Sequence, residues 1–317
     1  MKKFGTRFLA VFLTVLVCVV SASATMLIPG GQVIGLQISD DTVSVAGFHE
    51  TLGGGAKSAG LLEGDRILAV DGKPVKSVED IRKNLETSDG TVNLSVMRKG
   101  KTLKMRMSPA VTPDGPKLGV YLRQGISGLG TVTFYEKDTG KFGALGHGVN
   151  ATGGKLIQCR GGNVYNASVF SVKKGAVGKP GQLLGQLTEE TSVGSVAKNT
   201  AQGVFGSMTA KEDTALPVGQ AKVGPAVIRS TVCDKGMQEY SVEILKIYPS
   251  SSERTRNLLL KVTDQALLDT TGGIVQGMSG SPIIQDGKLV GAVTHVLVND
   301  PTTGYGIFIE NMLNAAA

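Results

Sequence analysis

The 317-residue chain has no tryptophan, only three histidines and only three cysteines. No two histidines or cysteines stand at the spacing of metal ligands, so neither a metal nor another cofactor is expected. Basic residues outnumber acidic ones by 33 to 26, but they are scattered and are not interleaved with aromatic side chains. This pattern argues against nucleic acid as a partner. Cys159 and Cys233, which follow the N-terminal segment, give no specific disulfide signal and are expected to be buried thiols.

Long helical periodicities are also scarce, whereas glycine is abundant. The 44 glycines are about twice the average share of this residue. A chain of this length buries a substantial core and is long enough for two domains. We therefore expect a mainly β protein in which many short strands are joined by tight turns.

A serine flanked by glycines is the most informative feature that the chain does contain. It lies in GMSGSP, residues 277–282, which precede two apolar runs joined by an Asp-Gly turn. This pattern predicts a nucleophile on a tight loop that enters a β-hairpin, with Ser279 favoured over Ser281. Gly277 permits a backbone in which the N–H groups of Gly277 and Ser279 point to one spot, and this predicts an oxyanion hole.

A serine hydroxyl needs a base of near-neutral pKa, and histidine is the side chain that supplies it. The three histidines are His49, His147 and His295. Only His147 lies between glycines, in FGALGHGV at residues 142–149, where its imidazole has room and access. We predict that His147 is the general base.

The third member of such a site is a carboxylate that fixes the tautomer of the base. Asp264 and Asp269 both precede the serine closely, and Asp213 lies between the histidine and the serine. The spacing does not choose among these three carboxylates.

These motifs resemble the stage IV sporulation protein B (SpoIVB) serine peptidases of spore-forming Firmicutes, and the resemblance covers nearly the whole chain. The segments that carry it are FGALGHGV (142–149), TGGIVQ (271–276) leading into the serine loop, THV (294–296) and NDP (299–301).

The resemblance implies an N-terminal membrane or export segment, a PDZ domain and a chymotrypsin-like serine peptidase domain with the order His, Asp, Ser. It implies His147 as the base, Asp264 as the third member and Ser279 as the nucleophile. Chymotrypsin-like enzymes present an edge strand to the substrate just after the last hairpin, where this chain has His295. His295 is therefore expected to bind substrate.

Residues 58–75, SAGLLEGDRILAVDGKPV, resemble the middle of a PDZ domain. The same residues predict a strand at 66–70 and an Asp-Gly hairpin, followed by a helix with Ser77 as its N-cap. PDZ domains bind an extended peptide by adding it to a sheet edge beside a helix. We expect residues 30–38 to supply that loop and edge strand, with Gly35 as a substrate-binding position.

The first 25 residues have a basic start, an apolar run at 8–20 and small residues at 22–24. This fits a secretory signal that is cleaved near Ala24. No charge occurs from Phe8 through Gly35, so the segment also fits a single membrane anchor. The basic residues ahead of the apolar run keep the N-terminus cytoplasmic, and in both cases the rest of the chain is exported.

We expect four segments along the chain. They are an export signal or anchor at 1–25, a PDZ domain at 28–108, a proline-containing linker at 109–116 and a serine peptidase domain at 117–317. The peptidase domain is expected to form two β-barrels with the active site between them.

Two functions of different classes are compatible with these features. The first is an exported serine endopeptidase. The resemblance then implies sporulation signalling in the forespore intermembrane space, by cleavage of the extracytoplasmic part of a membrane regulator that controls an intramembrane protease and sigma-factor processing. It also implies cleavage of the chain's own N-terminal region. The alternative is a scaffold whose PDZ domain binds membrane-protein segments and in which hydrolysis is dispensable.

Overall fold

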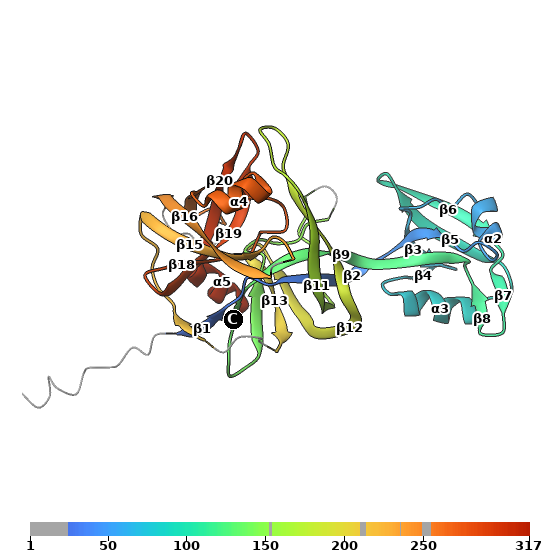
Figure 1. The fold of residues 1–317 in the computed structure, drawn as a ribbon. Coiled ribbons are helices and arrows are strands. Elements are labelled where there is room, and N and C mark those ends of the chain that lie inside the picture. The colour runs from blue at the N-terminus through green and yellow to red at the C-terminus, as the bar shows by residue number, and fades with distance from the viewer. Residues whose placement is uncertain (1–24, 152–153, 210–213, 235, 249–254) are drawn as a thin grey trace, which may run out of the picture.

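The structure, a computed structural model, describes residues 25–151, 154–209, 214–234, 236–248 and 255–317. The expected export segment, apart from Thr25, lies outside the described residues. Within the described residues, no helix is both long and apolar enough to cross a membrane. The fold is mainly β, as expected, and Figure 1 shows two β-barrels and a smaller α/β module in a row with the first barrel in the middle.

Six antiparallel strands form the first barrel, which closes because β2 pairs with β11 on one side and with β9 on the other. In β2 the side chains of Ile34, Leu36 and Ile38 share one face and are buried in the barrel core, as the two-residue period of a strand requires. In ring order the strands are β2 (Val33–Phe48), β9 (Val120–Tyr135), β10 (Lys141–Ala144), β13 (Gly203–Met208), β12 (Gln182–Thr200) and β11 (Gly161–Lys173), with β1 (Met26–Pro29) pairing with β9 and with β14 (Leu216–Pro217).

The second barrel is a separate closed ring with its own core around Ile228, Ile244 and Leu260. The expectation of two β-barrels is therefore confirmed. Cys159 packs against the core of the first barrel and Cys233 against that of the second, and both are free thiols that remain partly exposed. The strands in ring order are β15 (Gly224–Thr231), β16 (Met237–Ile247), β17 (Leu258–Val262), β20 (Asp300–Phe308), β19 (Lys288–Leu297) and β18 (Pro282–Gln285), with helices α4 (Gln265–Thr271) and α5 (Ile309–Ala316) following β17 and β20.

The smaller module has the helix and strands that were expected for a PDZ domain, around a third core. Its helix α3 begins where the sequence predicts, because the Ser77 side chain accepts a hydrogen bond from the Asp80 N–H and the Asp80 carboxylate accepts one from the Ser77 N–H. The elements are α2 (Gly54–Ser58), β3 (Arg66–Val70), β4 (Lys73–Pro74), α3 (Val78–Glu86), β5 (Val92–Arg98), β6 (Lys101–Met107) and the hairpin β7 (Ala110–Thr112) with β8 (Gly115–Lys117).

Two long strands belong to both the module and the first barrel. Residues 33–38 of β2 pair with 126–131 of β9 in the barrel, and after a register shift residues 43–48 pair with 120–124 in the module. In Figure 1 these two strands run together from the barrel into the module. The module is thus inserted between two neighbouring barrel strands. This arrangement differs from the expected order of a PDZ domain from residue 28 followed by a self-contained peptidase from residue 117.

We predict that the fragment from Lys117 to Ala317 does not fold, because it lacks β2 and so leaves one edge of β9 and one edge of β11 without a strand partner, which opens the first barrel. A variant in which Asn-Gly replaces residues 40–124 should fold, since it joins the barrel halves of β2 and β9 by a two-residue hairpin turn. Circular dichroism and peptide hydrolysis by both proteins check this prediction. A folded, active 117–317 fragment would contradict it.

Candidate active site

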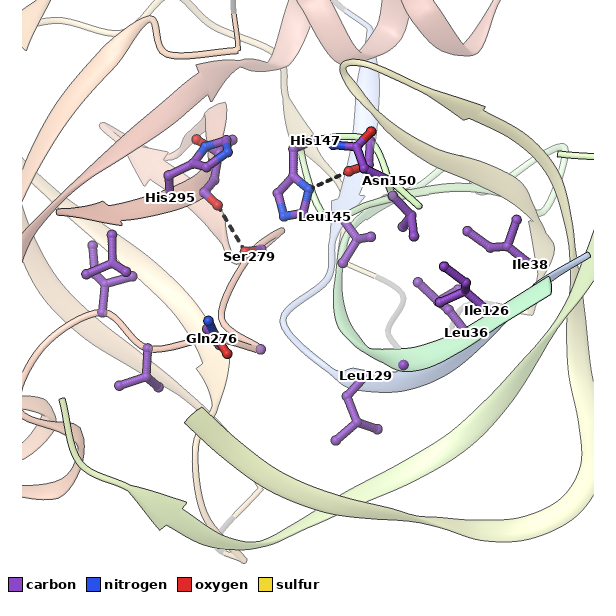
Figure 2. Close-up of a pocket in the computed structure, with 18 residues that line it drawn as sticks. Leu36, Ile38, Ile126, Leu129, Leu145, His147, Asn150, Gln276, Ser279 and His295 are labelled. Carbon is purple, nitrogen blue, oxygen red and sulfur yellow. Dashed lines mark hydrogen bonds between the residues drawn. The ribbon is translucent and has the colours of Figure 1, made fainter. Parts of the chain in front are cut away.

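A cavity of about 530 Å³ lies where the two barrels meet, and Figure 2 shows the side chains around it. Four of the predicted site residues line this cavity: His147 from the first barrel, and Gly277, Ser279 and His295 from the second. The two remaining predicted residues, Asp264 and Gly35, are not among its lining residues.

The serine loop connects α4 to β18 and lies directly against the first barrel. Gly280 has a φ of +98°, which glycine adopts without strain. A Cβ at this position would collide with the carbonyl oxygen of Thr131 and would lie 2.5 Å from the backbone nitrogen of Leu145. Glycine at 280 therefore allows Ser279 to approach the barrel that carries the histidine.

Thr131 of β9 joins both halves of the site. Its N–H donates to the carbonyl of Ser279 (3.2 Å) and its side-chain hydroxyl donates to the carbonyl of Gly277 (2.7 Å). Its own carbonyl accepts a hydrogen bond from the N–H of Leu145 (3.2 Å), which begins the loop that carries His147. Since Thr131 itself is fully buried, these bonds fix the two loops relative to each other.

The same contacts leave the predicted oxyanion donors free. The carbonyls of Gly277 and Ser279 are held by Thr131, and within the described residues the N–H groups of Gly277 and Ser279 donate no hydrogen bond. Gly277 has a φ of +100° and lines the cavity. Two unpaired N–H groups on a nucleophile loop are what an oxyanion hole requires.

His147 follows β10 on a loop that turns at Leu145 and Gly146, both with positive φ. Its Nδ1 lies 2.9 Å from the carbonyl oxygen of Gly148, and because a carbonyl only accepts, Nδ1 carries the proton. In the neutral ring Nε2 is therefore the free acceptor. Burial lowers the pKa of His147, while the hydrogen bond to Gly148 opposes this shift, so the ring is in its basic form at neutral pH.

Ser279 and the two histidine rings converge in the cavity. Figure 2 shows the rings of His147 and His295 on either side of Ser279, and their centroids are 5.2 Å apart. The Ser279 hydroxyl donates to the carbonyl of Thr294 (3.0 Å). For proton transfer the hydroxyl must turn from this carbonyl toward His147.

Ser281, the less favoured nucleophile, has a different environment. It is fully buried, and its hydroxyl donates to the hydroxyl of Ser230 at 3.0 Å. Its hydroxyl thus links the residue just before β18 to β15, and since Ser281 does not line the cavity it has no access to a substrate there.

His295, which the family resemblance suggested as a substrate-binding residue, lines the cavity. Burial, followed by the nearby charges of His147 and Arg256, lowers the pKa of His295 to about 4. Its Nδ1 is buried without a hydrogen-bond partner among the described residues. His295 is therefore neutral at physiological pH.

The structure does not bring Asp264 to His147. Asp264 is the N-cap of α4, and its carboxylate accepts hydrogen bonds from the N–H groups of Leu267 (3.0 Å) and Ser241 (3.3 Å). The sequence contains this signal, because an aspartate directly before Gln-Ala-Leu-Leu is a typical helix start. The capping role explains the position of Asp264 without a catalytic one.

The other two candidate carboxylates do not replace it. Asp269 is exposed on α4 and accepts a hydrogen bond from the side chain of Gln265 (2.8 Å). Asp213 lies outside the described residues. Within the described residues no carboxylate lines the cavity, and the Gly148 carbonyl holds the Nδ1 proton of His147.

Gly35 lies in the barrel half of β2, between Leu129 and Tyr165 of the neighbouring strands. A Cβ at this position would collide with the side chain of Leu187 in the same barrel. Gly35 is therefore not part of a groove in the PDZ module. The sequence did not reveal this placement, because the alternation of buried and exposed residues along a strand does not change where the strand passes from one core to another.

A groove of the expected kind lies elsewhere in the module, between α3 and the first residues of β9. Residues 120–124 of β9 pair with β2 on one side, and within the described residues their other side has no strand partner. The segment Leu118-Gly119-Val120, with Gly119 at a φ of +74°, leads into this edge. The cavity at this groove has a volume of about 510 Å³ and is lined by apolar side chains that include Val78, Ile81, Leu85, Leu118, Val120 and Leu122.

Comparisons with known families identify both parts of the chain. The sequence profile described as SpoIVB peptidase S55 matches residues 115–313, and that of the PDZ domain matches residues 33–108. Two curated proteins that carry a zinc-metalloprotease name, from Agrobacterium fabrum and Rhizobium meliloti, are 38% and 32% identical over 77 residues, which is 24% of this chain. The chain spans only 20% and 21% of the length of these relatives.

Solved structures show weaker likenesses. The PDZ domain of an SdrC-like protein from Listeria monocytogenes is 22% identical, with a TM-score of 0.23, over 26% of this chain and 87% of that one. The active form of the Rv3671c protease from M. tuberculosis is 15% identical, with a TM-score of 0.34, over 60% of this chain and 72% of that one. At these TM-scores neither structure bears on the site.

We predict that Thr131→Val lowers kcat by about 10- to 100-fold, because the Gly277 carbonyl loses its partner and the adjoining oxyanion donor shifts. Thr133→Val is the matched control. Thr133 is equally buried and donates to the carbonyl of Gly280 (2.8 Å), a residue whose own N–H is not an oxyanion donor. Both variants should lose about 1–3 kcal/mol of stability. Equal kcat values for the two variants would show that Thr131 does not position the oxyanion-hole N–H groups.

Asp264→Asn should leave kcat nearly unchanged, since asparagine caps a helix as well as aspartate does. Asp264→Ala should lower the free energy of unfolding by about 1 kcal/mol, again with little effect on kcat. A fall of about 10⁴-fold in kcat for Asp264→Asn, as expected for a carboxylate that orients the base, would restore Asp264 to the catalytic site.

The acidic limb of the kcat/KM profile should have its midpoint below pH 6.5. Proton transfer requires neutral His147, and burial lowers the pKa of His147 below its ordinary value of 6.5, so activity persists as the pH falls through 6.5. Peptide hydrolysis measured between about pH 4.5 and 8 checks this. A midpoint above 6.5 would mean that an additional group, such as a carboxylate, stabilises the charged form of His147.

Proposed function

Since the chain belongs to the SpoIVB peptidase S55 family and is a serine peptidase, we propose that it is an exported endopeptidase of sporulation signalling. Its substrate is the extracytoplasmic part of a membrane protein that regulates an intramembrane protease, and cleavage triggers sigma-factor processing. The family and the presence of a PDZ domain support a protein substrate. The basic and apolar pattern of residues 1–25 supports export, with the chain anchored in the membrane or released by cleavage near Ala24.

The observation that carries the catalytic part is the convergence of Ser279, His147 and two free N–H groups in one cavity. In this mechanism Nε2 of His147 takes the proton of the Ser279 hydroxyl as its oxygen attacks the scissile carbonyl. The N–H groups of Gly277 and Ser279 stabilise the resulting oxyanion, and the protonated ring of His147 then gives its proton to the leaving amine. Water repeats these steps to release the acyl group.

The cavity itself favours neutral, apolar side chains in the substrate. Its lining includes Leu36, Ile126 and Leu129 from the first barrel and Ile274 and Val296 from the second, and no acidic residue, lysine or arginine of the described residues is part of it. A charged side chain entering this space would lose hydration without gaining an ion pair. We therefore expect cleavage next to apolar residues.

The groove beside α3 is suited to hold a second, extended part of the same protein substrate. The unpaired edge of β9 at residues 120–124 offers backbone hydrogen bonds, and the apolar side chains of α3 provide contact surface. The N-terminal region of another copy of the chain is a second candidate substrate, which would produce self-cleavage.

Labelling with a fluorophosphonate tests this function in the purified full-length protein, because only an activated serine reacts. We expect the wild-type protein and Ser281→Ala to be labelled, and Ser279→Ala to remain unlabelled. His147→Ala should lower turnover by about 10⁶-fold, since the members of such a site act as a unit. If the folded wild-type protein is not labelled, the alternative of a binding scaffold with dispensable hydrolysis is favoured.

A further inference from the structure

The orientation of His147 depends on one peptide group. The Nδ1 proton of His147 is donated to the carbonyl oxygen of Gly148 at 2.9 Å, and within the described residues no carboxylate lines the cavity. A ring held by a single carbonyl points its Nε2 correctly only if that carbonyl is itself fixed. The groups that fix the peptide unit between Gly148 and Val149 therefore determine where the base points.

Asn199 holds the opposite end of this peptide unit. The C=O and N–H groups of a trans peptide point in opposite directions. The Gly148 carbonyl faces His147, and the Val149 N–H donates to Oδ1 of Asn199 at 2.9 Å. The imidazole and the Asn199 side chain are thus joined through one rigid planar unit.

The remaining hydrogen bonds of Asn199 serve the same loop. Its Nδ2 donates to the carbonyls of Val149 (2.8 Å) and Ile157 (2.9 Å), so all three bonds of the side-chain amide hold the backbone that follows His147. Asn199 lies near the end of β12. The adjoining turn contributes as well, because the N–H of Gly148 donates to the carbonyl of Ala201 (3.2 Å).

We propose that Asn199 is a positioning residue for the base. Its side chain fixes the peptide unit whose carbonyl holds the Nδ1 proton of His147, which directs Nε2 toward Ser279. This inference rests on the proposed function, in which His147 is the base. Hydrogen bonds in series polarise one another, so acceptance of the Val149 N–H by Asn199 also strengthens the Gly148 carbonyl as an acceptor.

The charged form of His147 depends on the hydrogen bond from its Nδ1 to the Gly148 carbonyl, because of the groups around the ring. Among the described residues, the titratable groups near this site are His295, whose ring centroid is 5.2 Å away, and Arg256, whose charge acts on His295. Neither stabilises an imidazolium. Burial lowers the pKa of His147 and the Gly148 carbonyl raises it, so loss of that hydrogen bond should lower the pKa further.

Asn199→Ala tests the proposal, with Gln285→Ala as a matched control. Gln285 of β18 makes the same three kinds of bond: its Oε1 accepts from the N–H of Lys222 (2.8 Å), and its Nε2 donates to the carbonyls of Lys222 and Pro225 (both 3.0 Å). Gln285 does not line the catalytic cavity. The two substitutions therefore remove similar hydrogen bonds and differ in what those bonds support.

We expect Asn199→Ala to lower kcat by about 100-fold with little change in KM, because a misplaced base slows the chemical step and not substrate binding. The acidic limb of its kcat/KM profile should move to lower pH. Gln285→Ala should lose a similar amount of thermal stability and keep its kcat and its pH profile. Equal kcat values for the two variants would overturn the proposal.

A second pair of variants covers the case in which Asn199→Ala does not fold. Asn199→Asp keeps an oxygen that accepts from the Val149 N–H but loses the two donors, and Gln285→Glu makes the same exchange at the control site. We expect Asn199→Asp to retain kcat within about tenfold of the wild type. If Asn199→Asp loses as much activity as His147→Ala while Gln285→Glu loses none, the acceptor bond does not support the base and the proposal fails.

Nitrogen-15 NMR of the histidine rings tests the proposal independently of any activity. The wild-type protein should show His147 with its proton on Nδ1, and Asn199→Ala should show a mixture of the two tautomers. If a fluorophosphonate does not label the folded wild-type protein, the proposed hydrolysis is refuted. The NMR measurement of the His147 tautomer can still be made in that case. A pure Nδ1–H tautomer in Asn199→Ala would refute the positioning role alone.

Discussion

The hydrogen bonds of Thr131 are the constraint on which the whole site depends. Ser279, the proposed nucleophile, and His147, the proposed base, come from different barrels, and each lies on a loop that has no regular structure of its own. Thr131 holds the serine loop through the carbonyls of Gly277 and Ser279, and holds the histidine loop through the N–H of Leu145. Since Thr131 is fully buried, breaking one of these bonds costs more than breaking a surface bond. The two loops can therefore be aligned before any substrate binds.

The strand that contains Thr131 also reaches the second cavity. Its first residues form the free edge beside α3, and its later residues line the catalytic cavity. The module is connected to the barrel through two paired strands and not through a flexible linker, as Figure 1 shows. A peptide added to this edge would be held at a fixed distance from Ser279. In the proposed function, the residues that recognise the substrate and those that cut it are separate, but both lie on one sheet.

Local features were predictable from the sequence, and long-range ones were not. The helix that starts at Ser77 and the serine loop before the last hairpin depend on neighbours in the chain, so their patterns identify them. Asp264 also had a local pattern, that of a helix cap, but the family resemblance suggested a catalytic role. The placement of Gly35 and Asn199 depends on partners many residues away, and no periodicity of a single strand reveals which of two cores it enters.

Two features define the proposed catalytic centre: a peptide carbonyl orients the base, and two backbone N–H groups form the oxyanion hole. The crystal structure of the protein with Ser279 phosphonylated by a fluorophosphonate tests both features most directly. We expect the phosphonyl oxygen within hydrogen-bond distance of the N–H groups of Gly277 and Ser279, with Nδ1 of His147 still bonded to Gly148. A carboxylate hydrogen-bonded to Nδ1 of His147, or an oxygen that points away from both N–H groups, would contradict this description of the site.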